Sequence, residues 1–506
     1  MNVLKDEASP SWNDFNALAI TLPVFALFIL VLIGLIFSAV PRTRPPMSWV
    51  LRRWFFCTAA LVTVIALFYA EENWRGQRAI ERSRLELKAK GVVLDWDKFI
   101  PPAVPDDQNV FKAPKMQDWF VNSDGKRDSR KAKELTDLLQ SPKNFPVWGD
   151  SKTIDTETDA RAYLAWSDGL RPQFDLIREA LKRPYSRMDG DYSQTLVLPF
   201  PNFIAIRAVA RVLAQRSHCY LIVHEPEKAV AELALMHNLS HLLDAKPTGK
   251  PMTLVAAMIN VSVVGLHAEI VGKGFQTHAW QEAQLVELQR QLSDVHAMIP
   301  VATSFESEPA ASSRAMRTVS MKDIANVFGS QANLFRVAPH GWILQNIANE
   351  TQFFWAPAEV FNTQSGSVSL RLLKDNQRRL EEFISHKSPF RILAAMTIPN
   401  FSKTVLTTAH NQNTANEALL ACALERYRLA NGSYPDSLES LAPKFLDKIP
   451  QDVINGGPLQ YHRADGSYIL YSIGWNEKDD GGTAASTSDN RPDLDNGDWV
   501  WQYAAK

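Results

Sequence analysis

The chain has 506 residues, of which 46% are hydrophobic, and its 54 Lys and Arg against 55 Asp and Glu give a formal net charge of −1. This balance excludes the strong positive field on which nonspecific nucleic-acid binding depends, so we expect no nucleic-acid partner. The length also exceeds the size at which a single hydrophobic core keeps growing, which predicts two or more folded units.

Two uncharged apolar stretches near the N-terminus predict a transmembrane helix hairpin over residues 1–72. The first covers 17–40, and the second covers 54–70 within a predicted span of about 52–70. Each is close to the roughly 20 residues with which a helix crosses a bilayer. A cleaved signal peptide is disfavoured because the residues before the first stretch are acidic and the stretch is too long. Aromatic residues flank the second stretch, as they do at both membrane surfaces: Trp49, Trp54, Tyr69 and Trp74. The lipid bilayer is therefore an expected partner.

The loop between the two spans is basic, and this bears on the orientation. It holds Arg42, Arg44, Arg52 and Arg53, whereas the N-terminal tail has Lys5 alone. The positive-inside rule then places the loop in the cytoplasm and the soluble part outside. The opposite orientation stays open, because the Arg and Lys residues after the second span would suit a cytoplasmic, lipid-attracted segment.

The residues after the anchor fall into three predicted regions. Residues 73–100 form a juxtamembrane region, in which a charged helix over 71–90 continues the second span and stops at Gly91. Residues 101–155 form a proline-rich connector and an irregular segment, because prolines cannot continue a helix. Residues 156–395 show helical apolar spacing throughout and predict a large all-α domain.

Within this all-α domain, two segments are predicted in more detail. A helical hairpin spans 203–223 and 226–243, with Pro226 at the first position of the second helix. The apolar run 252–271 contains Asn260, His267 and Glu269, so we expect a buried core helix rather than a third span.

The last region, 396–506, predicts a small α+β module. An amphipathic helix covers 414–430, and a short helix follows at 436–442, where Asp436 and Glu439 have capping-box spacing. Strands are predicted at 459–463, 467–473 and 499–503, and Asp465-Gly466 is a hairpin-turn dipeptide between the first two. The predicted fold class is therefore mainly α, with a small antiparallel sheet at the end.

Three sequence blocks in this module resemble the soluble domain of the major pseudopilin of type II secretion systems. They read ERYRLANGSYP at 425–435, LDKIPQD at 446–452 and YILYSIG at 468–474. The sequence departs from that family because 396–410 is not a membrane span leading into the helix. The whole chain, including ENWRG at 72–76 and WNEKDDGG at 475–482, is also similar to uncharacterised bacterial two-span membrane proteins.

The pseudopilin resemblance implies a calcium site in an acidic loop that follows the sheet. The residues to which it carries this role are Asp479, Asp480, Asp493, Asp495 and Asp498, with Ser472 as a lesser candidate. Calcium takes six to eight oxygen ligands, which such a loop supplies. The alternative interpretation is a solvated acidic tail.

A second metal hypothesis concerns His237 and His241, which stand one helical turn apart and could share a zinc ion. Asn238 occupies the position where a metalloprotease motif has its general-base Glu, so histidines without a metal are the simpler interpretation. Cys219 and Cys422 are expected to be buried free thiols; the alternative is one disulfide bond between them.

No phosphate-binding loop, nucleophile elbow or dinucleotide fingerprint occurs in the sequence. We therefore expect a protein without catalytic activity: an interaction or scaffold component of the cell envelope, with envelope proteins as partners and a calcium-stabilised C-terminal module. Two alternatives stay open, a membrane-bound metal-dependent hydrolase that uses the helical-domain histidines and an accessory subunit of a secretion-like machine.

Overall fold

The structure is a computed structural model that describes residues 47–122, 130–142, 145–146, 148–149, 153–193, 195, 198–250, 253–318, 338–386, 388–398, 401–464, 466–488 and 491–502. The first predicted span, 17–40, lies outside the described residues. The described part is mainly helical, with small antiparallel sheets, the largest of them near the C-terminus.

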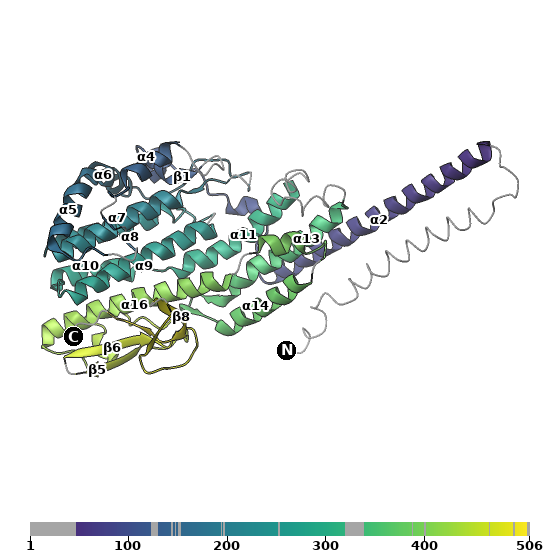
Figure 1. Ribbon diagram of the computed structural model, residues 1–506. Coiled ribbons are helices and arrows are strands. Elements are labelled where there is room, and N and C mark those ends of the chain that lie inside the picture. Colours follow the sequence, from purple (N-terminus) through teal and green to yellow (C-terminus); the bar gives the residue numbers. More distant parts are fainter. Residues whose placement is uncertain are drawn as a thin grey trace.

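A single helix, α2 (Met47–Ala89), contains both the second apolar stretch and the predicted juxtamembrane helix. Its first half projects from the body, whereas its second half joins it (Figure 1). Gly91 follows with a φ of +82°, and Val92 donates its N–H to the Leu87 carbonyl, which ends the helix. The prediction of one continuous helix that stops at Gly91 is confirmed.

The second half of α2 packs along α13 (His340–Trp355), with which it shares a separate hydrophobic cluster around Ile80, Trp342 and Ile347. The crossing is unusually close. A Cβ atom on Gly76 would lie 2.4 Å from Cα of Gly341, so only glycine fits. The ENWRG phrase at 72–76 therefore has a structural role, which is to join the apolar helix to the body.

Polar contacts accompany this crossing. The Trp342 indole donates to Glu72 Oε2 over 2.9 Å, and the Gly341 N–H donates to Asn73 Oδ1 over 2.8 Å. Glu72 is 2% exposed, and burial raises the pKa of its carboxyl. These contacts lie directly after the apolar half of α2, so they fix the direction in which that half leaves the body.

The body is a stack of antiparallel helices in which each pair packs on the next (Figure 1). In the predicted hairpin, α7 (Phe203–Ile222) is followed by α8, which begins at Pro226 as expected but ends at Asn238 rather than at 243. Side-chain caps begin several helices, as when Thr156 Oγ1 accepts the Asp159 N–H over 3.1 Å at the start of α5. The stack contains α5 (Glu157–Ser167), α6 (Arg171–Ala180), α7 (Phe203–Ile222), α8 (Pro226–Asn238), α9 (Leu254–Gln276), α10 (Glu282–Ser293) and α11 (Met298–Thr318).

Two helices among the described residues are long and apolar enough to cross a membrane, α2 and α9. None of the most apolar window of α2 is buried within the body, whereas half of that of α9 is. Helix α9 packs against α7, α8 and the long helix α16 (Phe401–Asn431), and His267 within it is 3% exposed. Its packing agrees with the predicted core helix.

The predicted irregular segment contains more structure than the sequence suggested. It forms α3 (Met116–Phe120), α4 (Arg130–Leu138) and strand β1 (Val121–Asn122), which pairs antiparallel with β2 (Phe200–Pro201). Leu135 of α4 is fully buried. These elements are too short for a sustained hydrophobic period, and their contacts with α7 decide their structure.

After α13, the chain forms β3 (Phe361–Asn362), β4 (Ser367–Val368), α14 (Leu370–Ser385) and α15 (Ile392–Thr397) before α16. Helix α16 begins 13 residues before the predicted start at 414, because its first turns also pack in the core through Phe401 and Val405. The three predicted strands appear as β5 (Gln460–Ala464), β6 (Ser467–Ser472) and β9 (Trp499–Val500), in the antiparallel order β5-β6-β9. Asp465 of the predicted turn lies outside the described residues.

Two further features of this region differ from the sequence expectation. The short helix is a 3₁₀ turn, Leu438–Leu441, whose N-cap residue is Ser437, so the predicted capping box with Asp436 is wrong. Asp436 pairs with Arg463 of β5 instead. A second hairpin, β7 (Ala484–Ser486) with β8 (Pro492–Gly497), was not predicted, because Asp, Asn and Gly have low strand propensity.

One hydrophobic cluster extends from Val110 to Trp501 and includes both the helical stack and the C-terminal sheet. Helix α16 is the shared element: α9 and α10 cover one side, and β6 lies on another (Figure 1). Cys219 and Cys422 are both buried free thiols within this cluster, and burial raises the pKa of Cys219 to about 12.

Candidate functional site

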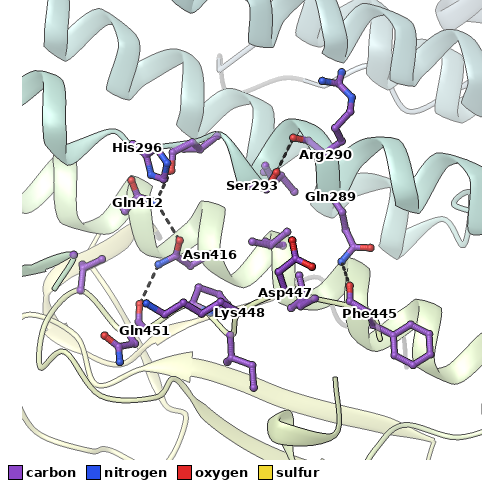
Figure 2. A pocket seen from close by; sticks show the side chains of 18 of the residues that line it. Gln289, Arg290, Ser293, His296, Gln412, Asn416, Phe445, Asp447, Lys448 and Gln451 are labelled. Carbon is purple, nitrogen blue, oxygen red and sulfur yellow. Dashed lines mark hydrogen bonds between the residues drawn. The ribbon is translucent and has the colours of Figure 1, made fainter. Parts of the chain in front are cut away.

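A groove of about 710 Å³ lies where the helical stack meets the C-terminal region. One wall is α10 with the start of α11, the floor includes α16, and the other wall is the segment 443–453 that precedes β5 (Figure 2). This volume is within the range of about 300–1,000 Å³ that ligand pockets have. The groove is therefore the candidate site that the described structure offers.

Side-chain amides hold the walls of the groove together. Gln289 of α10 donates to the Phe445 carbonyl over 3.0 Å, and Asn416 of α16 donates to the Gln451 carbonyl over 3.0 Å. Gln412 accepts the Ala297 N–H over 2.8 Å and donates to Asn416 Oδ1 over 3.1 Å. Figure 2 shows this chain of bonds running from α16 to the opposite segment. The groove therefore has fixed walls before any ligand binds.

The charged side chains that line the groove are mostly basic. Arg290 is bonded to Glu287 over 2.6 Å, and Arg426 to Glu282 over 2.8 Å, with both acids on the outer surface of α10. Within the part of the chain that the structure describes, Lys444 and Lys448 have no carboxylate partner, and both are exposed. Asp447 is the one acidic residue among the described lining residues.

The predicted calcium ligands divide into two groups. Asp479, Asp480 and Asp498 come together, because Asp498 accepts N–H bonds from Asp480 over 3.1 Å, Gly482 over 2.7 Å and Thr483 over 3.2 Å. Asp493 and Asp495 lie on β8, where Asp493 accepts the Asp495 N–H over 3.1 Å. The Asp498 carboxylate therefore holds the backbone of the loop that carries Asp479 and Asp480.

These acids already have protein partners. Asp479 Oδ1 accepts bonds from the Tyr471 hydroxyl over 3.1 Å and the Gly481 N–H over 2.9 Å, and Asp480 pairs with Lys478. Carboxylate oxygens are suitable ligands for calcium. In the residues that the structure covers, however, no three His, Cys, Asp or Glu side chains are arranged to hold a metal ion. Calcium at this loop stays a prediction, and binding would require these carboxylates to exchange N–H partners for the ion.

Ser472, the lesser candidate, belongs to a buried network instead. Its hydroxyl donates to Asp452 Oδ1 over 2.9 Å, and Asn413 of α16 donates to the same oxygen over 2.9 Å. Glu417 of α16 lies beside them and is 3% exposed. Burial, with the nearby Asp452 carboxylate, raises the pKa of Glu417 well above 4.5. The network joins α16, β6 and the segment before β5.

The two histidines proposed for zinc do not share one α-helix. Helix α8 ends at Asn238, so His241 lies in the following 3₁₀ turn, Leu239–Leu242, where its Nδ1 is 3.2 Å from Asp244 Oδ2. His237 faces a different histidine, with its ring centroid 6.0 Å from that of His267 on α9. Burial lowers the pKa of His237 and lowers that of His267 to about 4, so both rings are neutral near pH 7.

The other acid and histidine near these positions in sequence are engaged elsewhere. Glu232 pairs with the buried Arg216 over 2.9 Å, and His218 contacts the Ile154 carbonyl over 3.1 Å. The structure therefore places none of them with His237 in a common set of ligands.

No protein-family model, no curated protein sequence and no solved structure matches the chain. The resemblance to pseudopilins accordingly stays a prediction from the three sequence blocks.

Sequence reasoning missed the groove, although one signal pointed to it. Helix α16 carries Gln412, Asn413 and Asn416 in a run that is otherwise mostly buried, and amides in a core helix must find hydrogen-bond partners. Those partners lie in the segment 443–453 and at Ala297, far away in sequence. The position of the groove could therefore not be obtained from local patterns.

Proposed function

We propose that this chain is an inner-membrane protein of the bacterial cell envelope whose soluble part lies outside the cytoplasm and acts as an interaction or scaffold component. The proposal includes the membrane hairpin with 17–40 as its first span and a pseudopilin-like C-terminal module that calcium stabilises.

The observation that carries the proposal is the contrast between the two halves of α2. In its first half, Trp54, Phe55 and Phe56 are 70%, 71% and 68% exposed. Leaving such a side chain in water costs about 1.5–3 kcal/mol relative to an apolar environment, so a surrounding bilayer explains their exposure. In the second half, the same helix is fixed to α13 through Gly76 and Glu72. An anchor joined in this way holds the body at a set distance from the lipid.

The arrangement of α16 supports an interaction role rather than assembly into a fibre. Assembly of copies into a fibre through the long helix would require a free side on that helix. Here α9 and α10 cover that helix opposite the sheet. The groove beside α16 offers a place for a partner instead.

Two measurements test the membrane part of the proposal. Carbonate extraction should leave the full-length chain in the membrane fraction. A C-terminal fusion to alkaline phosphatase, which is active only after export, should show enzyme activity. A C-terminal fusion to a green fluorescent protein that folds only in the cytoplasm should show no fluorescence. Release by carbonate would contradict the anchor. The reverse pattern of reporter activity would place the soluble part in the cytoplasm and remove the argument for calcium.

The scaffold part is tested by purification from cross-linked membranes under native conditions. We expect envelope proteins to be recovered in defined ratios with the wild-type chain. Recovery of the chain alone would contradict a scaffold role.

A further inference from the structure

We propose that the groove between α10 and the segment 443–453 binds an extended peptide segment of a partner protein, one that alternates apolar side chains with carboxylates. This inference rests on the proposed interaction role and adds to it the site and the chemistry of the partner.

Apolar side chains are exposed along the walls of the groove. Val286 on α10 is 45% exposed, and Ile299 on α11 is 46% exposed, although both line the groove. Leu446 and Ile449 of the opposite segment are half-buried. Exposed apolar side chains that continue into a concave site are a mark of a binding surface. A ligand that covers them must bring apolar side chains of its own.

The same groove is also lined by basic side chains. Lys444 and Lys448 stand on the segment opposite α10, with the Lys444 ammonium 5.2 Å from the Phe445 ring. Arg290 and Arg426 add two further cations, which Glu287 and Glu282 partly neutralise from outside the groove. Asp447 provides the single acidic group in the lining. The surplus of cations favours a partner with carboxylates.

The main chain of the segment 443–453 offers hydrogen-bonding groups that suit a peptide ligand. Among the described residues, no hydrogen bond involves the backbone N–H or carbonyl groups of Asp447, Lys448 and Ile449. A peptide can hydrogen-bond to such groups, and in an extended peptide successive side chains point to opposite sides, one toward the floor and the next toward the lysines. Because the amide contacts already hold the walls, the groove loses little flexibility on binding.

The test uses the full-length chain in nanodiscs of zwitterionic lipid and three labelled hexapeptides. The first alternates Leu and Asp, the second Leu and Lys, and the third Ser and Asp. Fluorescence anisotropy should show that the Leu-Asp peptide binds about tenfold more tightly than either of the others, because it alone satisfies both the apolar lining and the cations.

Variants then assign the binding to the groove. Reversing both lysines, Lys444→Glu with Lys448→Glu, should weaken binding of the Leu-Asp peptide by about tenfold, because two attractions become repulsions. Val286→Asp should weaken it as well. Matched controls are Lys403→Glu, an exposed lysine at the start of α16, and Val255→Asp, which is 49% exposed at the start of α9 and lies outside the groove. Neither control should change binding.

The inference is overturned if the Leu-Asp peptide binds no more tightly than the Leu-Lys peptide, or if the double reversal leaves its affinity unchanged. Failure of the scaffold role gives a different result: the wild-type chain then recovers no envelope protein from cross-linked membranes. If the wild-type chain recovers partners and the double reversal retains all of them, the scaffold role stands and the groove is not its binding site.

Discussion

Gly76 of α2 and Gly341 of α13 meet backbone to backbone. A Cβ atom on Gly341 would lie 1.8 Å from the Glu72 carbonyl oxygen, and one on Gly76 would lie 2.4 Å from both Cα and the carbonyl oxygen of Gly341. Neither position can accept a side chain unless the two helices separate. Because α2 also carries the apolar half that we assign to the membrane, this contact determines how the anchor and the body are joined.

The first prediction concerns this crossing. Gly341→Ala should lower the stability of the chain by about 1–3 kcal/mol, because an added methyl group in a tightly packed contact forces the helices apart. Differential scanning fluorimetry in detergent should show a lower Tm, and limited proteolysis should show faster cleavage near α13. Gly169→Ala is the matched control, since no atom lies within 4 Å of its added Cβ. Equal Tm values for the two variants would mean that the crossing does not contribute to stability.

Local signals in the sequence predicted much of the secondary structure. Pro226 begins α8 as expected, because its missing N–H is harmless there, and Gly91 ends α2, because glycine adopts a positive φ without strain. The strands β5 and β6 also agree with their predicted positions within one residue at each end. These features depend on neighbours in the chain, which a sequence displays directly.

Features that depend on distant partners were not predicted. The match of Gly76 with Gly341 requires two helices that only the fold brings together. Asp436 could not be recognised as a partner of Arg463 rather than a helix cap. The groove likewise requires α10, α16 and the segment 443–453 to meet. Asp498 accepts N–H bonds from the short loop that carries Asp479 and Asp480, and this contact too joins residues that are separated in sequence.

The second prediction separates the scaffold from the hydrolase alternative. His237 faces His267, and His241 is bonded to Asp244, so we expect the purified chain to contain much less than one zinc ion per molecule. Inductively coupled plasma mass spectrometry measures this directly. His237→Ala and the exposed control His386→Ala should give the same zinc content. One zinc per chain that is lost only in His237→Ala would instead favour a metal-dependent hydrolase.

The third prediction tests calcium at the acidic loop. Millimolar Ca²⁺ should raise the Tm of the wild-type chain relative to EDTA, and Asp480→Asn or Asp495→Asn should remove that increase. Asp436→Asn, in the same region but outside the loop, should retain it. A calcium effect of the same size in all of these chains would place the ion elsewhere, and no effect in the wild type would leave the acids as a solvated loop.

The role of Asp498 in this loop is distinct, which gives the fourth prediction. Its buried carboxylate accepts N–H bonds from Asp480, Gly482 and Thr483. Asp498→Ala should therefore lower the Tm even in EDTA, because a buried N–H without an acceptor costs about 1–3 kcal/mol. Asp495→Asn in EDTA should be close to the wild type, since Asp495 lies on the exposed strand β8. A normal Tm for Asp498→Ala in EDTA would contradict this capping role.

The last prediction follows from the buried carboxyl of Glu417. Its pKa in the folded chain is raised well above the ordinary value of 4.5, chiefly by burial and also by the charge of Asp452. The stability that this group contributes is therefore fully present below pH 4.5. As the pH rises, the unfolded chain releases its proton first, and stability falls until the folded pKa is reached.

Replacement of this carboxyl by an amide should remove that loss. Glu417→Gln should resemble the wild type at pH 4 and be more stable at pH 8, with the difference growing by up to about 1.4 kcal/mol for each pH unit between the two pKa values. Thermal unfolding of both chains from pH 4 to pH 8 measures the difference. Glu382→Gln, at an exposed position on α14, should follow the wild-type curve at every pH. Parallel curves for Glu417→Gln and the wild type would show that Glu417 ionises normally, and the network around Asp452 would then have to accommodate two negative charges.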